Sequence, residues 1–325
     1  MPRMCKACVA NESVRKEVAD LSSTIVTWVR ATRPQFLTIT AVAVCLGVMA
    51  AAADGVSVEW GAALLCLAGA LCAHAGANMV NDFHDREGDA GNVERLTPFT
   101  GGSRMIQDGV LTPGSTALAG YSLIVAAAAI GIVLWGAGNV ALLGVGFVGI
   151  VLAVAYSAPP LRLSARGLGE GVVAAAWLLV VVGTDLVVRG AWSLQPVILG
   201  APLACLVGAI LWVNEYPDEQ ADRRVGKRTL VVSLGGRRAA QLHVLLVVVA
   251  YGWLMGMIGV DSVPATAVFG LLGLPWSVFA AVRLLRVADS NEGSLKFMPV
   301  IRATIIAAHL HGMGMIAGLW LVLPS

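Results

Sequence analysis

The sequence predicts an all-α polytopic membrane protein with nine transmembrane helices, and three observations support this class. First, the 325 residues are 58% hydrophobic and only 13% charged, with a mean hydropathy of +0.80, far outside the range of a soluble globular domain. Second, the apolar residues are gathered in long runs. Third, lysine and arginine fall almost entirely into alternate connections between these runs. The net charge of +2 is too small to indicate a nucleic-acid partner.

Nine apolar runs are long enough to cross a bilayer, since one crossing needs about 20 predominantly apolar residues. Backbone polar groups in lipid must be hydrogen-bonded within their own segment, and the runs are too long for barrel strands, so each run is expected to be a helix. The predicted helices cover residues 36–53, 60–81, 115–136, 139–157, 169–188, 193–214, 238–260, 263–282 and 301–323.

The basic residues assign the two sides of the membrane. With these nine helices, 21 of the 22 lysines and arginines lie in the N-terminal segment or in alternate connections, and only Arg189 lies on the other side. The positive-inside rule makes the basic side cytoplasmic. We therefore expect a cytoplasmic segment at 1–33, a nine-helix domain at 34–325, and a multi-pass protein of the inner (plasma) membrane whose active site faces the cytoplasm.

The N-terminal segment offers few further signals. It has no apolar region close to Met1, which argues against a cleaved signal peptide. Cys5 and Cys8 form a CxxC pair, but the second pair or the neighbouring histidines that a zinc site needs do not follow. The other four cysteines lie inside apolar runs, where cysteine behaves as a small hydrophobic residue.

The connections after the second and sixth predicted helices are long, lie on the cytoplasmic side and begin with acidic motifs. The first motif is NDFHDREGD, residues 81–89, and the second is contained in NEYPDEQADRR, residues 214–224. In a helix, residues four apart point in nearly the same direction, so each motif forms one ridge of oxygen-bearing side chains. The first ridge consists of Asn81, Asp85 and Asp89, with Asp82 beside it. The second ridge consists of Asn214, Asp218 and Asp222.

Carboxylates stacked at this spacing repel one another, the more so near the low-dielectric membrane edge, and so need a positive partner. Mg²⁺ prefers oxygen ligands and typically takes one or two carboxylates while sharing its other positions with water and substrate phosphate. One such motif alone would more simply be a solvated acidic helix end. Here there are two motifs, and in each an asparagine stands four residues before an aspartate of the ridge, and basic residues follow. This repetition favours a magnesium site that holds a diphosphate. Its predicted ligands are Asn81, Asp82, Asp85, Asp89, Asn214, Asp218 and Asp222.

Basic residues follow both motifs at positions suited to phosphate. Arg95 and Arg104 follow the first motif, and Lys227 and Arg228 follow the second. Arginine binds phosphate bidentately and lysine binds it as a point charge, and the glycine pair at 101–102 lets backbone N–H groups approach an anion. For any one of these residues, anchoring at the membrane surface is the simpler alternative.

With these motifs the sequence resembles the UbiA superfamily of intramembrane prenyltransferases, whose NDxxDxxxD and DxxxD patterns are met by NDFHDREGD and DEQAD. The resemblance covers nearly the whole chain. It implies a UbiA-like nine-helix bundle, Mg²⁺, and transfer of an isoprenyl group from a polyprenyl diphosphate to an acceptor, usually an aromatic ring. WVRATRPQFLT, GGSRMIQDGVLTP, YSAPPLRLSARGLGE and DRRVGKRTLVVSLG are most similar to the 1,4-dihydroxy-2-naphthoate polyprenyltransferases of menaquinone synthesis.

The resemblance also implies roles for individual residues. Arg33 and Arg162 would approach the diphosphate or the acceptor carboxylate, and Tyr156 would border the reacting carbon. The predicted catalytic residues are therefore Asp85, Asp218, Tyr156 and Arg162. The predicted diphosphate-binding residues are Arg33, Arg95, Arg104, Lys227 and Arg228.

In the expected reaction the allylic diphosphate loses its leaving group, metal ions and basic side chains stabilise the departing charge, and the electron-rich ring attacks. Water would quench the cation, so the bundle must exclude it. One alternative is a UbiA-like enzyme with another acceptor, such as 4-hydroxybenzoate, homogentisate, haem, a chlorophyll precursor or a glycerol lipid. The other is a transporter that uses intramembrane acids for cation coupling. Such transporters usually place the acids near the midplane and often contain inverted repeats, and neither feature is evident here.

Overall fold

A computed structural model describes residues 24–136, 138–290 and 292–323. In these ranges all regular secondary structure is helical, which confirms the all-α class. The predicted cytoplasmic segment 1–33 is described only from residue 24, so Cys5 and Cys8 lie outside the described residues.

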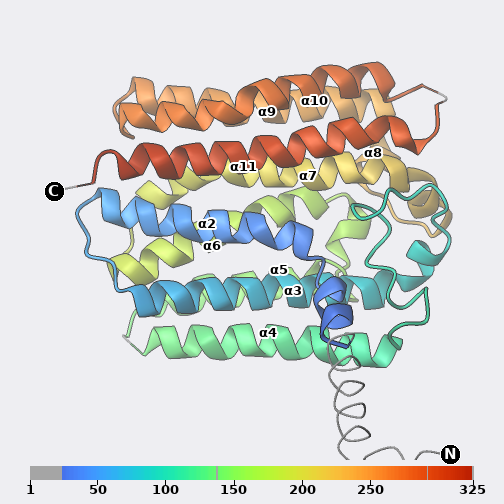
Figure 1. Ribbon diagram of the computed structural model, residues 1–325, viewed down its shortest axis with the longest axis horizontal. Coiled ribbons are helices and arrows are strands. Elements are labelled where there is room, and N and C mark those ends of the chain that lie inside the picture. Colours follow the sequence, from blue (N-terminus) through green and yellow to red (C-terminus); the bar gives the residue numbers. More distant parts are fainter. Residues whose placement is uncertain (1–23, 137, 291, 324–325) are drawn as a thin grey trace, which may run out of the picture.

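The main helices run along the length of one bundle (Figure 1). Four short helical pieces connect or extend them, namely η1 (Leu163–Arg166), α8 (Leu230–Leu234), η2 (Ala265–Gly273) and η3 (Ser294–Phe297). The main helices are α2 (Pro34–Ala53), α3 (Trp60–Ala90), α4 (Pro113–Trp135), α5 (Val140–Ala155), α6 (Gly169–Arg189), α7 (Gln195–Arg224), α9 (Gly236–Gly259), α10 (Leu274–Val287) and α11 (Met298–Trp320).

Eight helical segments within the described ranges are long and apolar enough to cross a membrane. They correspond to eight of the nine predicted crossings. The remaining one, predicted at 139–157, is helix α5, which has 16 residues. At 1.5 Å per residue α5 spans about 24 Å, less than the ~30 Å of a hydrocarbon core. The count of nine crossings and the cytoplasmic N-terminus therefore stay predictions.

The crossing predicted at 263–282 contains two kinds of helix. Its first part is the 3₁₀ helix η2, and α10 follows directly. Helix α11 lies very close to η2, because Gly314 and Gly318 have no side chain at the contact. A Cβ atom at either position would collide with the backbone of Phe269 or Thr266. These glycines are thus explained by close backbone packing.

Helices α3 and α7 carry the acidic motifs and continue well past their apolar portions. Helix α3 ends at Ala90 instead of residue 81, and α7 ends at Arg224 instead of residue 214. Both motifs are therefore helical, as the four-residue spacing predicted. The loops that follow α3 and α7 lie at the same end of the bundle, at the right of Figure 1, and the C-terminus lies at the opposite end.

Packing is uneven across the bundle. Helix α7 is central, and most of its apolar stretch is buried inside the protein, whereas most of the apolar stretch of α4 is not. The main core is formed by side chains from α2, α6, α7, α9 and α11, including Leu46, Leu203, Leu254 and Met315. On the other side of α3, helix α5 buries only Ala155. The cavity described next is lined by residues of α3, α4, α5 and α6, and also by residues of α2 and α7.

Candidate active site

A cavity of about 600 Å³ contains side chains from both acidic motifs. The ridge on α3 and the ridge on α7 face this space, although they lie far apart in the chain. Three further predicted residues, from three different connections, also line it. The predicted site residues in the cavity are Arg33, Asn81, Asp85, Asp89, Tyr156, Asn214, Asp218, Asp222 and Lys227.

Lys227 joins the two motifs at the polar end of the cavity. Its Nζ lies 2.8 Å from Oδ2 of Asp85 on α3 and 3.4 Å from Oδ1 of Asp222 on α7. All three side chains are largely buried, with 11%, 6% and 13% of their surface exposed. Burial lowers the pKa of Lys227, but the carboxylates of Asp85 and Asp222 raise it more, so the net pKa lies above the ordinary value. The ammonium group is therefore charged at neutral pH.

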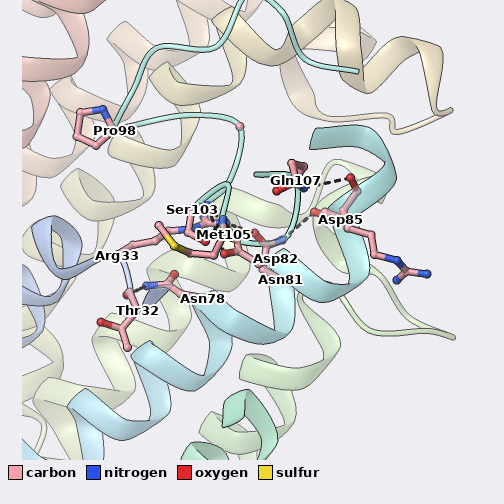
Figure 2. A network of polar contacts seen from close by, with 12 residues as sticks. Thr32, Arg33, Asn78, Asn81, Asp82, Asp85, Pro98, Ser103, Met105 and Gln107 are labelled. Carbon is pink, nitrogen blue, oxygen red and sulfur yellow. Dashed lines mark hydrogen bonds and ion pairs between the residues drawn. The ribbon is translucent and has the colours of Figure 1, made fainter. Parts of the chain in front are cut away.

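Arg33 reaches the same region from the residue that precedes α2. Its guanidinium donates to Asn81 Oδ1 at 3.1 Å and forms an ion pair with Asp82 (Figure 2). Arg33 has a left-handed backbone with φ 56°, and Asn78 Nδ2 holds the adjoining turn by donating to the carbonyl of Thr32 at 2.9 Å. Arg33 is among the residues that line the cavity, but Asp82 is not.

The loop that follows α3 closes over the acidic motifs through backbone groups. Gly101 and Gly102 both have φ +72°, a conformation that favours glycine. The N–H of Gly101 donates to Asp218 Oδ2 at 3.3 Å, and the N–H of Ser103 donates to Asp82 Oδ1 at 3.2 Å. A Cβ atom at Gly102 would collide with the Asp89 carboxylate. The glycine pair therefore shapes a loop whose N–H groups, from Gly101 and Ser103, donate to carboxylates of both motifs.

The donor set at the polar end fits Mg²⁺. Its donors are carboxylate and amide oxygens, which are the ligands that Mg²⁺ prefers. The Oδ1 atom of Asn214 is buried without a hydrogen-bond partner, and Asp89 lines the cavity. Among the described residues, no three His, Cys, Asp or Glu side chains are grouped so that they would hold an ion by themselves. Mg²⁺ typically takes one or two carboxylates and completes its shell with water and phosphate, so this arrangement suits an ion that is bound together with a diphosphate.

Five predicted site residues do not line this cavity. Asp82 holds Arg33 and the glycine loop, and Arg104 Nη1 donates to the carbonyl of Asp89 at 2.6 Å, which fastens the same loop to the end of α3. Arg95 lies beside Gly101 with a buried Nε, Arg228 is exposed, and Arg162 lines a separate, smaller cavity. The metal-binding, diphosphate-binding and catalytic roles predicted for these five residues stay predictions.

Away from the motifs the cavity becomes apolar. One face of α3 lines it from Asp85 back to Leu65, a distance of about 30 Å along the helix. Leu65, Ile132 and Phe147 line the cavity and also have 38%, 60% and 70% of their surface exposed. The cavity therefore opens sideways onto an apolar surface of α3, α4 and α5.

Among the lining residues that were not predicted from the sequence are two polar ones, His74 and Asn92. His74 precedes Asp85 by 11 residues, which is about three helical turns, and its Nδ1 is 2.8 Å from Thr40 Oγ1. His74 therefore shares the motif-bearing face of α3, and helical spacing was a usable signal. Asn92 Nδ2 donates to Asp218 Oδ1 at 2.6 Å, but Asn92 lies in an irregular loop, where spacing carries no such information.

Comparison with known proteins places these features in a family. The UbiA prenyltransferase family matches residues 40–320. Over 315 residues the chain is 28% identical to the 1,4-dihydroxy-2-naphthoate octaprenyltransferase of Escherichia coli, and the match covers 90% of this chain and 95% of that relative. It is 26% identical over 235 residues to the Bacillus subtilis protein of the same name, covering 70% of this chain and 72% of that relative.

The fold is similar to that of a UbiA homolog from Archaeoglobus fulgidus, whose structure was solved bound to DMAPP and Mg²⁺. The TM-score is 0.65 at 18% sequence identity, and the match covers 91% of this chain and 99% of that chain. The family match extends over most of the sequence and includes both acidic motifs, which confirms the resemblance found in the sequence. The chain therefore belongs to the UbiA prenyltransferase family.

Proposed function

We propose that this prenyltransferase uses Mg²⁺ to transfer a polyprenyl group from a polyprenyl diphosphate to 1,4-dihydroxy-2-naphthoate, as a step of menaquinone biosynthesis. The observation that carries the proposal is the continuity of one cavity, which has both acidic motifs at one end and apolar walls along the rest of its length. Such a shape suits a ligand with a charged head and a long hydrocarbon tail. The names of the relatives in Escherichia coli and Bacillus subtilis support the choice of acceptor.

The polar end would bind the diphosphate. Arg33 and Lys227 supply positive charge there, and the oxygen ligands of Mg²⁺ would come from the ridges on α3 and α7. When bound, Mg²⁺ would neutralise the charge that develops on the diphosphate oxygens as the carbon–oxygen bond breaks. Lys227 is held by Asp85 and Asp222, so its charge is already in position before the substrate arrives.

The apolar part of the cavity would hold the prenyl chain. Its length of about 30 Å along α3 accommodates several isoprene units, and the sideways opening near Ile132 and Phe147 lets a longer chain continue into lipid. Small residues keep this space open. Gly146 and Gly149 of α5 both line the cavity, and a Cβ atom at either would meet nothing within 4 Å.

Aromatic side chains in the cavity would bind the acceptor ring. The His74 ring packs edge-on against Trp177, with 4.7 Å between ring centroids. Tyr156 follows the last residue of α5 and lines the same cavity as the motifs. A phenol is uncharged at neutral pH, so Tyr156 offers a hydroxyl donor and an aromatic face. A neutral hydroxyl and aromatic faces suit an electron-rich ring close to a cationic centre.

Bond formation then follows from this arrangement. The carbon–oxygen bond of the donor breaks with its electron pair going to the diphosphate, and an electron pair of the acceptor ring forms the new carbon–carbon bond. The attacked ring carbon then releases its proton, or its carboxylate as carbon dioxide, and the ring becomes aromatic again. The buried position of Asp85 and the apolar walls limit the access of water to the allylic cation. We place the motif end of the bundle at the cytoplasmic face of the plasma membrane, because that end carries the basic connections.

The test is an assay of the purified protein with Mg²⁺, prenyl diphosphates of several lengths and a panel of aromatic acceptors, read by mass spectrometry. We expect prenylated 1,4-dihydroxy-2-naphthoate, loss of product on chelation and recovery when Mg²⁺ is restored. A product with 4-hydroxybenzoate or homogentisate instead would replace the proposed acceptor. No product with any acceptor at saturating Mg²⁺ would reject the proposed function.

A further inference from the structure

Two buried carboxyl groups meet beside the polar end of the large cavity. Glu170 is the second residue of α6, and Glu215 lies on α7 directly after Asn214. Both glutamates are buried, with 5% and 6% of their surface exposed, and their side chains are close enough to hydrogen-bond to each other. Glu215 lines the cavity, whereas Glu170 does not. Glu215 is therefore the member of the pair that a ligand can contact.

The two carboxyl groups lack the partners that buried polar groups normally have. Both side-chain oxygens of Glu170 are buried without a hydrogen-bond donor. Oε2 of Glu215 accepts from the N–H of Val231 at 3.3 Å, which is a long hydrogen bond. In the part of the chain that the structure describes, neither glutamate forms an ion pair with a lysine or arginine. The pair thus has acceptor capacity that the protein itself does not fill.

The polar groups around the pair are also short of partners. Ser164 lines the cavity with a buried, unpartnered Oγ, and it lies against the first residue of α6, Gly169. Asn214 Oδ1 is likewise buried and unpartnered. The phenol of Tyr156 lies within electrostatic reach of both glutamates, and the carbonyl of Tyr156 accepts from the N–H of Ser164 at 2.9 Å. Oxygen acceptors are therefore in excess in this part of the cavity.

An excess of buried acceptor oxygens fits a ligand group that donates hydrogen bonds. A diphosphate does not fit, because its oxygens are themselves acceptors and its charge is repelled by carboxylates. The ridge of Asn214, Asp218 and Asp222 also points elsewhere, since Glu215 is about 100° around α7 from it. A hydroxyl group on an aromatic ring is an uncharged donor, and the aromatic face of Tyr156 is close by.

We infer that Glu215 accepts a hydrogen bond from a hydroxyl group of the acceptor ring, and that Glu170 positions the Glu215 carboxyl group for this contact. The inference rests on the proposed function and names the substrate group that this part of the cavity recognises. Glu215 would thereby select rings that carry a hydroxyl at the correct position. An analogue without that hydroxyl leaves the buried oxygen unpaired, which is the costlier arrangement.

The chemistry of 1,4-dihydroxy-2-naphthoate indicates which of its two hydroxyl groups faces Glu215. The hydroxyl at ring position 1 is adjacent to the ring carboxylate and donates to it within the molecule. The hydroxyl at position 4 is not adjacent to the carboxylate and keeps its hydrogen free. Because like charges repel, the ring carboxylate is oriented away from Glu170 and Glu215. The 4-hydroxyl is therefore the group that Glu215 contacts.

Competition kinetics with two analogues tests this contact. The first, 1-hydroxy-2-naphthoate, lacks the 4-hydroxyl, and the second, 4-hydroxy-2-naphthoate, keeps it. Each is used as an inhibitor of 1,4-dihydroxy-2-naphthoate prenylation by the purified full chain at saturating Mg²⁺ and prenyl diphosphate. In the wild type we expect the 4-hydroxy analogue to inhibit with a constant near the KM of the acceptor, and the 1-hydroxy analogue to be about 10²-fold weaker.

Substitutions at the pair should change this ratio of inhibition constants. We expect Glu215→Met to bring the ratio to within about threefold and to raise the KM of the acceptor on the order of 10²-fold, with the KM of the prenyl diphosphate unchanged. Glu215→Gln keeps one acceptor oxygen and should give an intermediate ratio. Glu219→Met is the matched control, since Glu219 lies one turn further along α7, pairs with Arg223 at 2.8 Å and does not line the cavity.

The positioning role of Glu170 is tested by a double substitution. Glu170→Leu alone should lower the ratio several-fold, and it should have no further effect on the ratio when Glu215→Met is also present. Independent effects of the two substitutions on the ratio would overturn the positioning role. Melting temperatures are measured on the same preparations, because a purely structural pair would change the melting temperature and leave the ratio at its wild-type value.

Three outcomes would overturn the hydroxyl contact itself. The first is equal inhibition of the wild type by the two analogues. The second is a wild-type ratio in both Glu215→Met and Glu215→Gln. The third is a raised KM for the prenyl diphosphate with the ratio unchanged, which would place Glu215 in the diphosphate site. Failure of the proposed function is distinct from all three, because the wild type would then form no prenylated naphthoate product.

Discussion

Lys227 Nζ lies 2.8 Å from the Asp85 carboxylate, so the loop after α7 is tied directly to the motif on α3. The two residues are 142 positions apart in the chain and largely buried. Because Lys227 also lies 3.4 Å from Asp222, one ammonium group compensates carboxylates of both motifs. In the proposed function the same ammonium group binds the substrate diphosphate, so Lys227 would have a structural and a functional role together.

Replacing Lys227 by methionine should therefore reduce both stability and activity. Removing one partner of a buried ion pair leaves the other charge uncompensated, which typically destabilises a protein by about 3–5 kcal/mol. We expect a lower melting temperature in EDTA that Mg²⁺ partly restores, and a kcat/KM lower by on the order of 10²-fold. Arg224→Gln, at the exposed end of α7, is the control. A melting temperature equal to wild type in EDTA would contradict the buried-charge argument.

Asp85→Asn and Asp218→Asn should abolish most turnover while leaving a folded protein. Each substitution keeps the side-chain shape but removes a negative charge that we assign to the magnesium site, so kcat should fall on the order of 10²–10³-fold. Activity and melting temperature are measured on the same preparations. Asp108→Asn serves as the control because Asp108 is exposed and pairs with Arg104 at 3.7 Å, away from the cavity. Wild-type activity in either motif variant would exclude the metal role.

Asp82 should act through Arg33 and not as a separate ligand. It does not line the cavity, and its carboxylate accepts from Arg33 and from the N–H of Ser103. We expect Asp82→Asn and Arg33→Gln to be non-additive, with a coupling energy of roughly 0.5–3 kcal/mol in kcat/KM. The measurement is a double-mutant cycle. Strictly additive effects would instead favour Asp82 as an independent metal ligand.

The apolar part of the cavity should determine which prenyl chains are accepted. Gly149→Leu would place a side chain in open cavity space, and leucine favours a helix more than glycine does, so the fold should not suffer. We expect KM to rise by about tenfold for long prenyl diphosphates and to change little for short ones. Gly144→Leu is the matched control, since Gly144 lies on the same helix, is exposed and does not line the cavity. Equal effects of the two substitutions would argue against this location for the chain.

The sequence predicted the two ridges because helical spacing is local information. Asn81, Asp85 and Asp89 lie on one face of α3 wherever that helix sits, and both ridges indeed face one cavity. Helix ends were less predictable. Hydropathy marks where a helix leaves the apolar region, whereas α3 and α7 continue beyond that point into their polar motifs.

The sequence could not predict side-chain positions that depend on contacts between distant segments. Asp82 follows Asn81 by one residue, about 100° around the helix, and only the position of Arg33 explains why it serves as an anchor. Likewise, Arg162 was grouped with Asp85 from motif similarity, yet Arg162 lines only the separate, smaller cavity, whereas Asp85 lines both cavities. The pattern of residues within one segment does not report which cavity a side chain will border.

The sideways opening near Ile132 and Phe147 has a consequence for how substrate supply is measured. A donor that arrives through this opening diffuses within the bilayer plane, so its surface density governs encounter. Diluting a fixed amount of long-chain donor with inert phospholipid in proteoliposomes should then slow the reaction, even though the bulk concentration is constant. A rate that tracks the bulk concentration alone would point to delivery from water.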